Sequence, residues 1–309
     1  MGLIKKPTEI EVCPKIKMLI YGAAGQGKTT LACGAPKPLL FDCDGGIHRI
    51  NPAHIPDTVQ ATSYEEVLEV LNSPEIAEYE TIITDTGGKL LDMIGVYVIR
   101  RNPKLGRANG MLTLQGYGEV KAEFSQFCKL VVSKGKHLIF VAHRKAVGED
   151  DNIRYIPLFG GSNYDALVTE LDLVGYIEVT GNRPTITFTG TAHNDGKNTC
   201  NLPDIIDIPR VVDAQGHGLP NHFMENVIFA AYERHLQAIQ NMAHAYAKVL
   251  EELKEEIELI TDAPSANDFV ARIDKFNHIG ASKAAARELL RQKCSQLGLV
   301  YNKESRLYE

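Results

Sequence analysis

The chain has 309 residues, enough for one large domain or two smaller ones, and its 44% hydrophobic and 23% charged residues are typical of a soluble globular protein. A formal charge of −6 at pH 7 argues mildly against a surface coated in nucleic acid, although basic residues gather locally between Lys89 and Arg107. No apolar run approaches the roughly 18 residues that span a bilayer, and the N-terminus has no apolar segment of signal-peptide length. The six cysteines are scattered, which predicts reduced thiols in a cytoplasmic protein.

Short apolar runs alternate with amphipathic stretches over the first two-thirds of the chain, a pattern typical of an α/β fold with a mostly parallel sheet. The predicted strands are Lys17–Tyr21, Pro38–Phe41, Thr81–Thr84 and His137–Ala142. The predicted helices are Lys28–Cys33, Tyr64–Leu71, Gly87–Val98 and Tyr117–Lys134. Two later runs, Leu173–Val179 and Thr185–Thr189, flank the turn TGNRP and predict a hairpin that extends the sheet in antiparallel fashion. We expect this core to occupy residues 1–220.

Residues 221–309 have a helical pattern. Apolar residues recur at alternating spacings of three and four from Phe229 to Ile260, which predicts a heptad seam along a helix of more than 30 residues. The segment TDAPS ends that helix, and shorter helices are predicted near Asn267–Phe276 and Ser282–Leu297. This region either packs on itself as a small bundle or mediates oligomerisation through the seam.

The segment GAAGQGKT fits the P-loop pattern G-x-x-x-x-G-K-[ST]. Glycines allow a tight turn that points backbone N–H groups at phosphate oxygens, and the following helix adds its positive N-terminal end. Lys28 is expected to reach the β- and γ-phosphates of ATP, and Thr29 to place its hydroxyl on Mg²⁺. The residues expected around the nucleotide are Gly22, Ala23, Ala24, Gly25, Gln26, Gly27, Lys28, Thr29 and Thr30.

Acidic residues follow two later strands. Asp85 stands at the carboxyl end of its strand, where parallel sheets bind ligands, and is predicted to hold Mg²⁺ through water. Asp42 and Asp44 end the strand that we expect next to the P-loop strand, where an acid can polarise a water for attack on the γ-phosphate. Because side chains alternate along a strand, these two acids should project alike. Asp44 is favoured, since the glycines after it leave room for a ligand; Asp42 could instead orient the site or cap a helix.

The ordered set GAAGQGKTT, LLFDCDGG, TIITDTGG and HLIFVAHRK resembles the motifs of RecA-like recombinase ATPases. It looks most like their core-only phage branch, the Sak-type single-strand annealing proteins, over roughly residues 15–200. The resemblance implies a RecA-like P-loop core, in the host cytoplasm if phage-encoded. It places Asp44 at the catalytic base, where the family usually has Glu, and His143 at the polar sensor of the γ-phosphate. A histidine can donate a hydrogen bond to phosphate.

The same resemblance implies two loops that bind single-stranded DNA, matching Ile99–Gly118 and His143–Tyr164. Cations there suit phosphates, and aromatic side chains suit stacked bases. The DNA-binding residues implied are Arg100, Arg101, Lys104, Arg107, Arg144, Lys145, Arg154 and Phe159. An acidic tip, Glu149 to Asp151, interrupts the second loop and would repel phosphates.

RecA-type filaments also place a lysine or arginine on the neighbouring subunit's γ-phosphate. The matching region is TFTGTAHNDGKN, which makes Lys197 the candidate and Arg183 in the hairpin turn an alternative. We therefore expect a homo-oligomer, either a ring or a filament.

The leading hypothesis is a Mg²⁺-dependent ATPase that assembles on single-stranded DNA and promotes annealing or strand exchange in phage-type homologous recombination. DNA is expected to stimulate its hydrolysis. Its catalytic residues would be Lys28, Asp44, Asp85, His143 and Lys197, with Thr29 and Asp85 at the metal. The alternatives are a nucleotide-dependent switch or scaffold with protein partners, and a ring motor of the helicase type.

Overall fold

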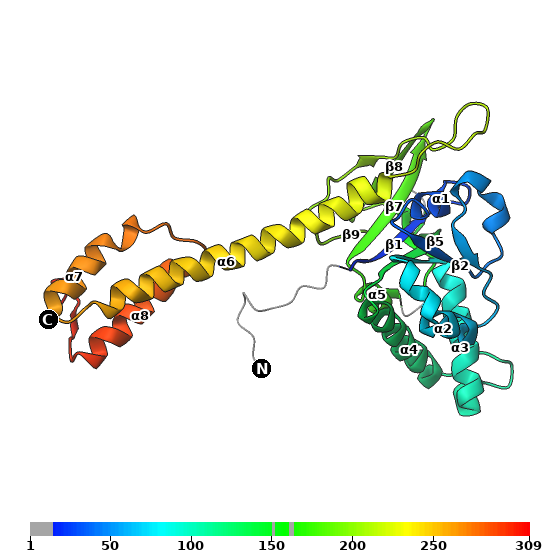
Figure 1. Ribbon diagram of the computed structural model, residues 1–309. Helices are drawn as coiled ribbons and strands as arrows, with labels where there is room; N and C mark the ends of the chain where they lie inside the picture. Colours follow the sequence, from blue (N-terminus) through cyan, green and yellow to red (C-terminus); the bar gives the residue numbers. More distant parts are fainter. Residues whose placement is uncertain (1–14, 150–151, 161–163) are drawn as a thin grey trace. The chain divides into compact units, whose positions relative to one another are not determined.

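The computed structural model describes residues 15–149, 152–160 and 164–309 (Figure 1). They divide into two compact units, a larger one that ends at Arg234 and a smaller one from His235 to Glu309. The division falls inside helix α6 (Ala230–Glu258), some way beyond the boundary at residue 220 expected from composition. Among the described residues, no helix combines the length and apolar character that a membrane span needs.

A single sheet organises the larger unit, with strand order β10-β8-β7-β1-β5-β4-β2-β3; β6 also pairs with β5, and β9 with β7. The strands are β1 Lys17–Gly22, β2 Pro38–Asp42, β3 Asp57–Val59, β4 Thr81–Asp85, β5 His137–Val147, β6 Arg154–Pro157, β7 Leu173–Thr180, β8 Arg183–Thr187, β9 Lys197–Asn198 and β10 Ile206–Asp207. The pairs among β1, β2, β3, β4, β5 and β7 are parallel, and β7–β8 is an antiparallel hairpin. The predicted α/β fold is therefore confirmed.

Helices cover the sheet, which explains why its inner strands are continuous apolar runs rather than alternating ones. The helices of this unit are α1 Lys28–Ala32, α2 Tyr64–Asn72, α3 Gly87–Arg101, α4 Leu114–Ser133 and α5 Tyr164–Val168. Side chains of α2, α3 and α4 form one core with alternate residues of the strands, including Leu19, Phe41 and Phe140. Helix α4 begins three residues before the predicted start, because the Thr113 side chain accepts a hydrogen bond from the Gly116 N–H and caps it.

The position of β2 differs from the expectation. We expected the strand that ends in Asp42 to lie next to the P-loop strand, but β5 and β4 lie between β2 and β1. Parallel strands are joined by long crossovers, so consecutive strands need not be neighbours. The carboxyl ends of all four strands still meet at one edge of the sheet.

The second predicted DNA-binding loop is largely a β-hairpin. Strand β5 continues five residues past its predicted end at Ala142 and pairs antiparallel with β6, from Arg144 opposite Pro157 to Val147 opposite Arg154. The residues of this extension, from His143 to Val147, are partly or fully exposed and include three polar side chains, as suits an edge ribbon with one solvated face. The apolar pattern therefore stopped short of the true strand end.

The smaller unit is a helical bundle with a short hairpin. It contains α6 from His235 onward, α7 Ala263–Arg272, α8 Ser282–Gln296, β11 Tyr301–Asn302 and β12 Leu307–Tyr308. Helix α6 has 29 residues and follows a π-helix, η8 Met224–Phe229. The last seam residues, Leu253, Ile257 and Ile260, are buried among Phe269, Leu290 and Cys294, so this part of the seam packs within the chain.

Helix α7 begins four residues earlier than predicted. The Asp262 carboxylate accepts a hydrogen bond from the Ser265 N–H, and the Ser265 hydroxyl accepts one from the Asp262 N–H. This reciprocal capping box satisfies two N–H groups at the helix start. Helix α6 does end before the segment TDAPS, and the proline of that segment, Pro264, lies in the first turn of α7, where a missing N–H costs nothing.

We predict that Leu253→Ala destabilises the smaller unit by about 2–5 kcal/mol, because it removes a fully buried side chain from the bundle core. Leu259→Ala is the matched control, since Leu259 is 73% exposed and its loss should change stability by less than about 0.5 kcal/mol. Calorimetry on the full chain measures both. Equal effects of the two substitutions would contradict this packing.

Candidate active site

The P-loop connects β1 to α1, and its backbone conformation requires glycine at three positions. Gly25 and Gly27 have φ angles of 76° and 75°, in the left-handed region that favours glycine. A Cβ atom at Gly22 would lie 2.7 Å from the carbonyl oxygen of Ile177 on β7. The three glycines are therefore required for the turn that presents backbone N–H groups to an anion.

Two polar side chains fold over this loop. The buried Lys28 ammonium donates a hydrogen bond to the Ala23 carbonyl oxygen at 2.7 Å. The Gln26 side-chain oxygen accepts the Ala23 N–H at 2.9 Å. Burial lowers the pKa of Lys28, while the carboxylates of Asp85 and Asp44 raise it. The Lys28 ammonium thus lies near Asp85 and Asp44, in the place where a P-loop binds phosphates.

Thr29 and Asp85 meet across the sheet edge. The Thr29 hydroxyl donates a hydrogen bond to Asp85 Oδ2 at 2.5 Å. Burial raises the pKa of Asp85 to about 6; the hydrogen bond from Thr29 lowers it, and the charge of Asp44 raises it further. A hydroxyl and a partly buried carboxylate are oxygen ligands of the kind that Mg²⁺ prefers, and the cation would favour the ionised carboxylate. The residues present therefore fit a Mg²⁺ ion.

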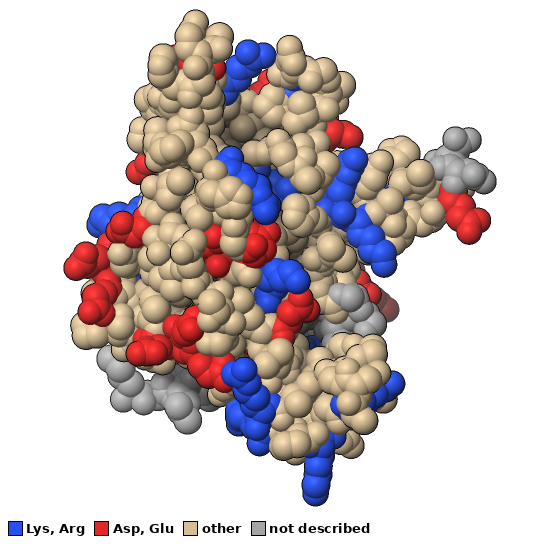
Figure 2. All heavy atoms as spheres, turned by 90° about the vertical axis from the view of Figure 1, so that its right-hand side faces the viewer, with Lys and Arg blue, Asp and Glu red and all other residues tan. Residues whose placement is uncertain are grey.

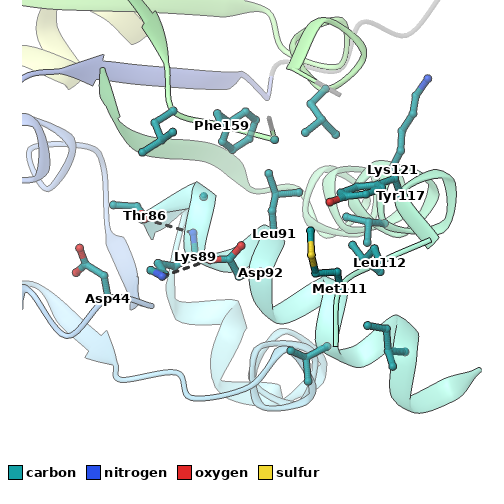
Figure 3. Close-up of a pocket in the computed structure, with 18 of the residues that line it drawn as sticks. Asp44, Thr86, Lys89, Leu91, Asp92, Met111, Leu112, Tyr117, Lys121 and Phe159 are labelled. Atoms are coloured by element: carbon teal, nitrogen blue, oxygen red, sulfur yellow. Dashed lines mark hydrogen bonds and ion pairs between the residues drawn. The ribbon is translucent and has the colours of Figure 1, made fainter. Parts of the chain in front are cut away.

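The two acids after β2 have different roles. Asp42 is buried and accepts hydrogen bonds from the N–H groups of Gly46 and Ile47 at 2.9 and 3.2 Å, so it holds the following turn. Asp44 lines a cavity at the strand edge, and its Oδ1 atom is buried with no hydrogen-bond partner among the residues that the structure describes (Figure 3). The two acids therefore have different contacts, and the alternation along the strand does not extend to Asp44, because β2 ends at Asp42.

His143 lies level with Gly22 in the parallel pairing of β5 with β1. It lines the same cavity as Asp44. Burial lowers the pKa of His143 below its usual value of 6.5, as does the charge of Lys28. The ring is therefore neutral at pH 7 and can donate one hydrogen bond. The structure thus brings Lys28, Thr29, Asp44, Asp85 and His143 to one edge of the sheet.

Two residues at this edge were missed in the sequence. Thr86 lines the cavity and accepts the Lys89 N–H at 3.3 Å as the N-cap of α3. A Thr between a strand-end acid and a helix is a recognisable cap signal. Arg49 ends the 3₁₀ helix η2 (Ile47–Arg49), and a Cβ atom at Gly46 would meet both Asp44 Oδ1 and Arg49 Nη1. Nothing in the sequence marked that short turn.

Lys197 lies away from the sheet edge where the carboxyl ends of the parallel strands meet. It pairs with Val174, which is level with Leu19 near the start of β1. Its ammonium donates to the carbonyl oxygens of Val168 and Thr169 at 3.4 and 3.3 Å. Contact with a neighbouring molecule's phosphate remains a prediction. The alternative, Arg183, makes two hydrogen bonds of 2.6 Å to Asp207.

The predicted DNA-binding cations fall into two groups. Lys104, Arg107 and Lys145 are exposed and have no ion pair among the described residues. Arg144 contacts the Tyr176 hydroxyl and the Tyr155 ring, and Arg154 pairs with Asp195. Arg100 pairs with Glu65 and Arg101 with Glu123, but both arginine side chains remain exposed. Figure 2 shows lysine and arginine side chains spread over one face with acids between them, not one continuous basic patch.

Phe159 corrects the prediction of a base-stacking side chain. It is 1% exposed and packs against Phe124 and Phe140, with ring centroids 5.5 and 5.4 Å away. A Cβ atom at Gly87 would lie 2.6 Å from its ring, so the start of α3 closes over it. The ring is part of the core in this conformation. Asp150 and Asp151, expected at the acidic tip, lie outside the described residues.

We predict that Asp85→Asn stabilises the nucleotide-free protein at pH 8. The pKa of Asp85 in the folded state, about 6, exceeds its ordinary value of 3.8, so the folded state binds this proton more tightly. That contribution is complete below about pH 4 and is lost as the pH rises through about 6. The asparagine of the variant does not ionise, so at pH 8 its free energy of unfolding should exceed that of the wild type by on the order of 1 kcal/mol.

Urea unfolding from pH 4 to pH 8, without Mg²⁺ or nucleotide, measures the difference between the variant and the wild type. Asp204→Asn, at an exposed acid, is the control and should follow the wild type. A difference that does not change with pH would contradict the raised pKa of Asp85.

Comparison with known proteins adds a family. No curated protein matches the chain. A family model described as an AAA domain matches residues 14–200, which include β1, the P-loop, Asp44, Asp85 and His143. AAA-type P-loop domains bind or hydrolyse nucleotides, typically ATP with Mg²⁺. The match covers more than half of the chain, and the protein therefore belongs to this AAA domain family.

Proposed function

We propose that this protein is a Mg²⁺-dependent ATPase that assembles on single-stranded DNA and promotes annealing or strand exchange of the phage recombination type. The observation that carries hydrolysis is Asp44, whose Oδ1 atom has no hydrogen-bond partner in the described ranges. It stands at the same strand edge as Lys28 and the Thr29–Asp85 pair. A carboxylate in this position can orient and deprotonate a water for attack on a γ-phosphate.

Each residue at the edge has one task in this proposal. The P-loop N–H groups and Lys28 bind the phosphates, and Thr29 and Asp85 hold Mg²⁺, which neutralises developing charge when bound. Asp44 accepts the proton of the attacking water. The neutral His143 donates a hydrogen bond to the γ-phosphate from the level of Gly22. On the RecA-like resemblance, Lys197 or Arg183 acts on the phosphate of a neighbouring molecule in a homo-oligomer.

DNA binding is supported by the exposed cations of the two predicted DNA-binding segments, Lys104, Arg107 and Lys145. It is also supported by the ordered motifs that resemble RecA-like and Sak-type proteins. Because the net charge is −6, strand binding must depend on such local cations and weaken steeply with salt. Arg144 and Arg154 hold the β5–β6 hairpin through the Tyr155 ring and Asp195, and the half-exposed Arg154 side chain can also contact a phosphate.

We predict that Asp44→Asn keeps ATP binding and loses at least about 100-fold in kcat, because the variant cannot accept the water proton. Lys28→Ala should lose nucleotide binding itself. Binding of a fluorescent ATP analogue and phosphate release measure the two steps separately. Asp204→Asn, at an exposed acid, should match the wild type. Full turnover by Asp44→Asn would show that Asp44 is not the catalytic base.

We predict that the triple variant Lys104→Ala, Arg107→Ala and Lys145→Ala binds oligonucleotides more weakly, with a salt slope smaller by about 2. The control replaces three exposed lysines elsewhere, Lys129, Lys275 and Lys303, with alanine and should retain the wild-type slope.

Absence of salt-sensitive DNA binding by the wild type, with and without an ATP analogue, would refute the proposal. Phosphate release that is indifferent to DNA would instead support a nucleotide-dependent switch, and unwinding of a forked duplex a ring motor.

A further inference from the structure

A cavity of about 700 Å³ adjoins the candidate active site inside the larger unit (Figure 3). It lies between α3, the segment 110–112, the start of α4 and residues 158–160. Its volume is in the range of small-molecule pockets, about 300–1,000 Å³. Figure 3 shows Asp44 and Thr86 on the side away from Tyr117, and His143 lines the same cavity and interacts electrostatically with Asp44, so an occupant would border the residues proposed to act on the γ-phosphate.

The opposite part of the cavity is apolar. Figure 3 shows Met111, Leu112 and Tyr117 close together, with Leu91 beside Met111 and Phe159 farther away. Met111 and Leu158 are each 54% exposed, although both are large apolar side chains. A polar end, apolar walls and an aromatic ring together suit a flat heteroaromatic group.

The rim carries cations. Lys89 on α3 pairs with Asp92 at 3.3 Å, an exposed contact that is easily exchanged. Lys121 on α4 is exposed and has no ion pair among residues 15–149, 152–160 and 164–309. Lys104 and Arg107 lie on the segment that joins these two helices. Cations on both helices suit an occupant with anionic groups on either side.

We propose that this cavity receives one unstacked base of a single-stranded DNA, with the flanking phosphates at Lys89 and Lys121. The inference rests on the proposed function, namely strand binding. A strand supplies a base with a phosphate on each side, which a free mononucleotide does not. Base stacking on Tyr117 would offset the small cost of unstacking in a single strand. The bound base would exclude bulk solvent from the cavity beside Asp44 and His143 while leaving the single attacking water at Asp44, and so link the strand to the γ-phosphate end.

The test compares oligothymidylate with an abasic strand of the same length and charge, by fluorescence anisotropy at one low salt concentration with an ATP analogue present. The wild type should prefer the strand with bases by about tenfold or more. Tyr117→Ala should reduce this preference to less than about threefold and leave abasic-strand affinity unchanged. Tyr301→Ala is the matched control, since Tyr117 and Tyr301 are 36% and 45% exposed. Met111→Ala should also reduce the preference for the strand with bases, as a second and independent test.

The outcomes separate the two levels of the proposal. Binding of neither strand refutes the proposed function. Equal binding of both strands by the wild type, or full preference in Tyr117→Ala, leaves DNA binding intact and overturns the base-binding cavity. Saturable binding of thymidine monophosphate that depends on Tyr117, without a strand preference, overturns it in favour of a free nucleotide. A strand with 5-iodouracil should crosslink to Tyr117 or Met111, and crosslinks confined to other segments would overturn the proposal.

Discussion

The hydrogen bond from Thr29 to Asp85 is the contact on which the site depends. It joins the first turn of α1 to the end of β4, across the intervening strand β5. The contact is possible because β1, β5 and β4 are parallel and end at one edge, a consequence of helical crossovers on both faces. Burial makes the Asp85 carboxylate costly, as its raised pKa indicates. Lys28 offsets part of this cost, and a Mg²⁺ ion bound with the nucleotide would offset more of it.

Strand β5 connects this edge to the surface that we propose for DNA. It carries Phe140 in the core, His143 at the edge and Arg144 in the hairpin beyond. Tyr21, which precedes the P-loop, donates its hydroxyl to the carbonyl oxygens of Tyr155 and Asp195 at 3.1 and 2.7 Å. These contacts anchor the β5–β6 hairpin to the P-loop strand.

Local signals were sufficient for the P-loop, for Asp85 and for most helices, because a motif or an apolar period fixes each within a few residues. Long-range pairing was not accessible. The order of β2, β4 and β5, the antiparallel partner of β5 and the cavity beside α3 all depend on segments distant in sequence. Phe159 shows why composition fails for single side chains: an aromatic residue among glycines and polar residues suits a binding loop, yet Gly87 allows α3 to pack directly on its ring.

The turn that carries Asp44 bears on its proposed role as catalytic base. Asp is one methylene shorter than the Glu that the RecA-like resemblance implies at this position, so in the proposed mechanism its backbone would have to lie closer to the attacking water. Asp42 fixes the turn after β2 through the N–H groups of Gly46 and Ile47. A Cβ atom at Gly46 would lie 2.7 Å from Asp44 Oδ1, so glycine is what admits the carboxylate there. Asp42 and Gly46 thus position Asp44 together. This explains why the end of β2 carries two acids although only Asp44 lines the cavity.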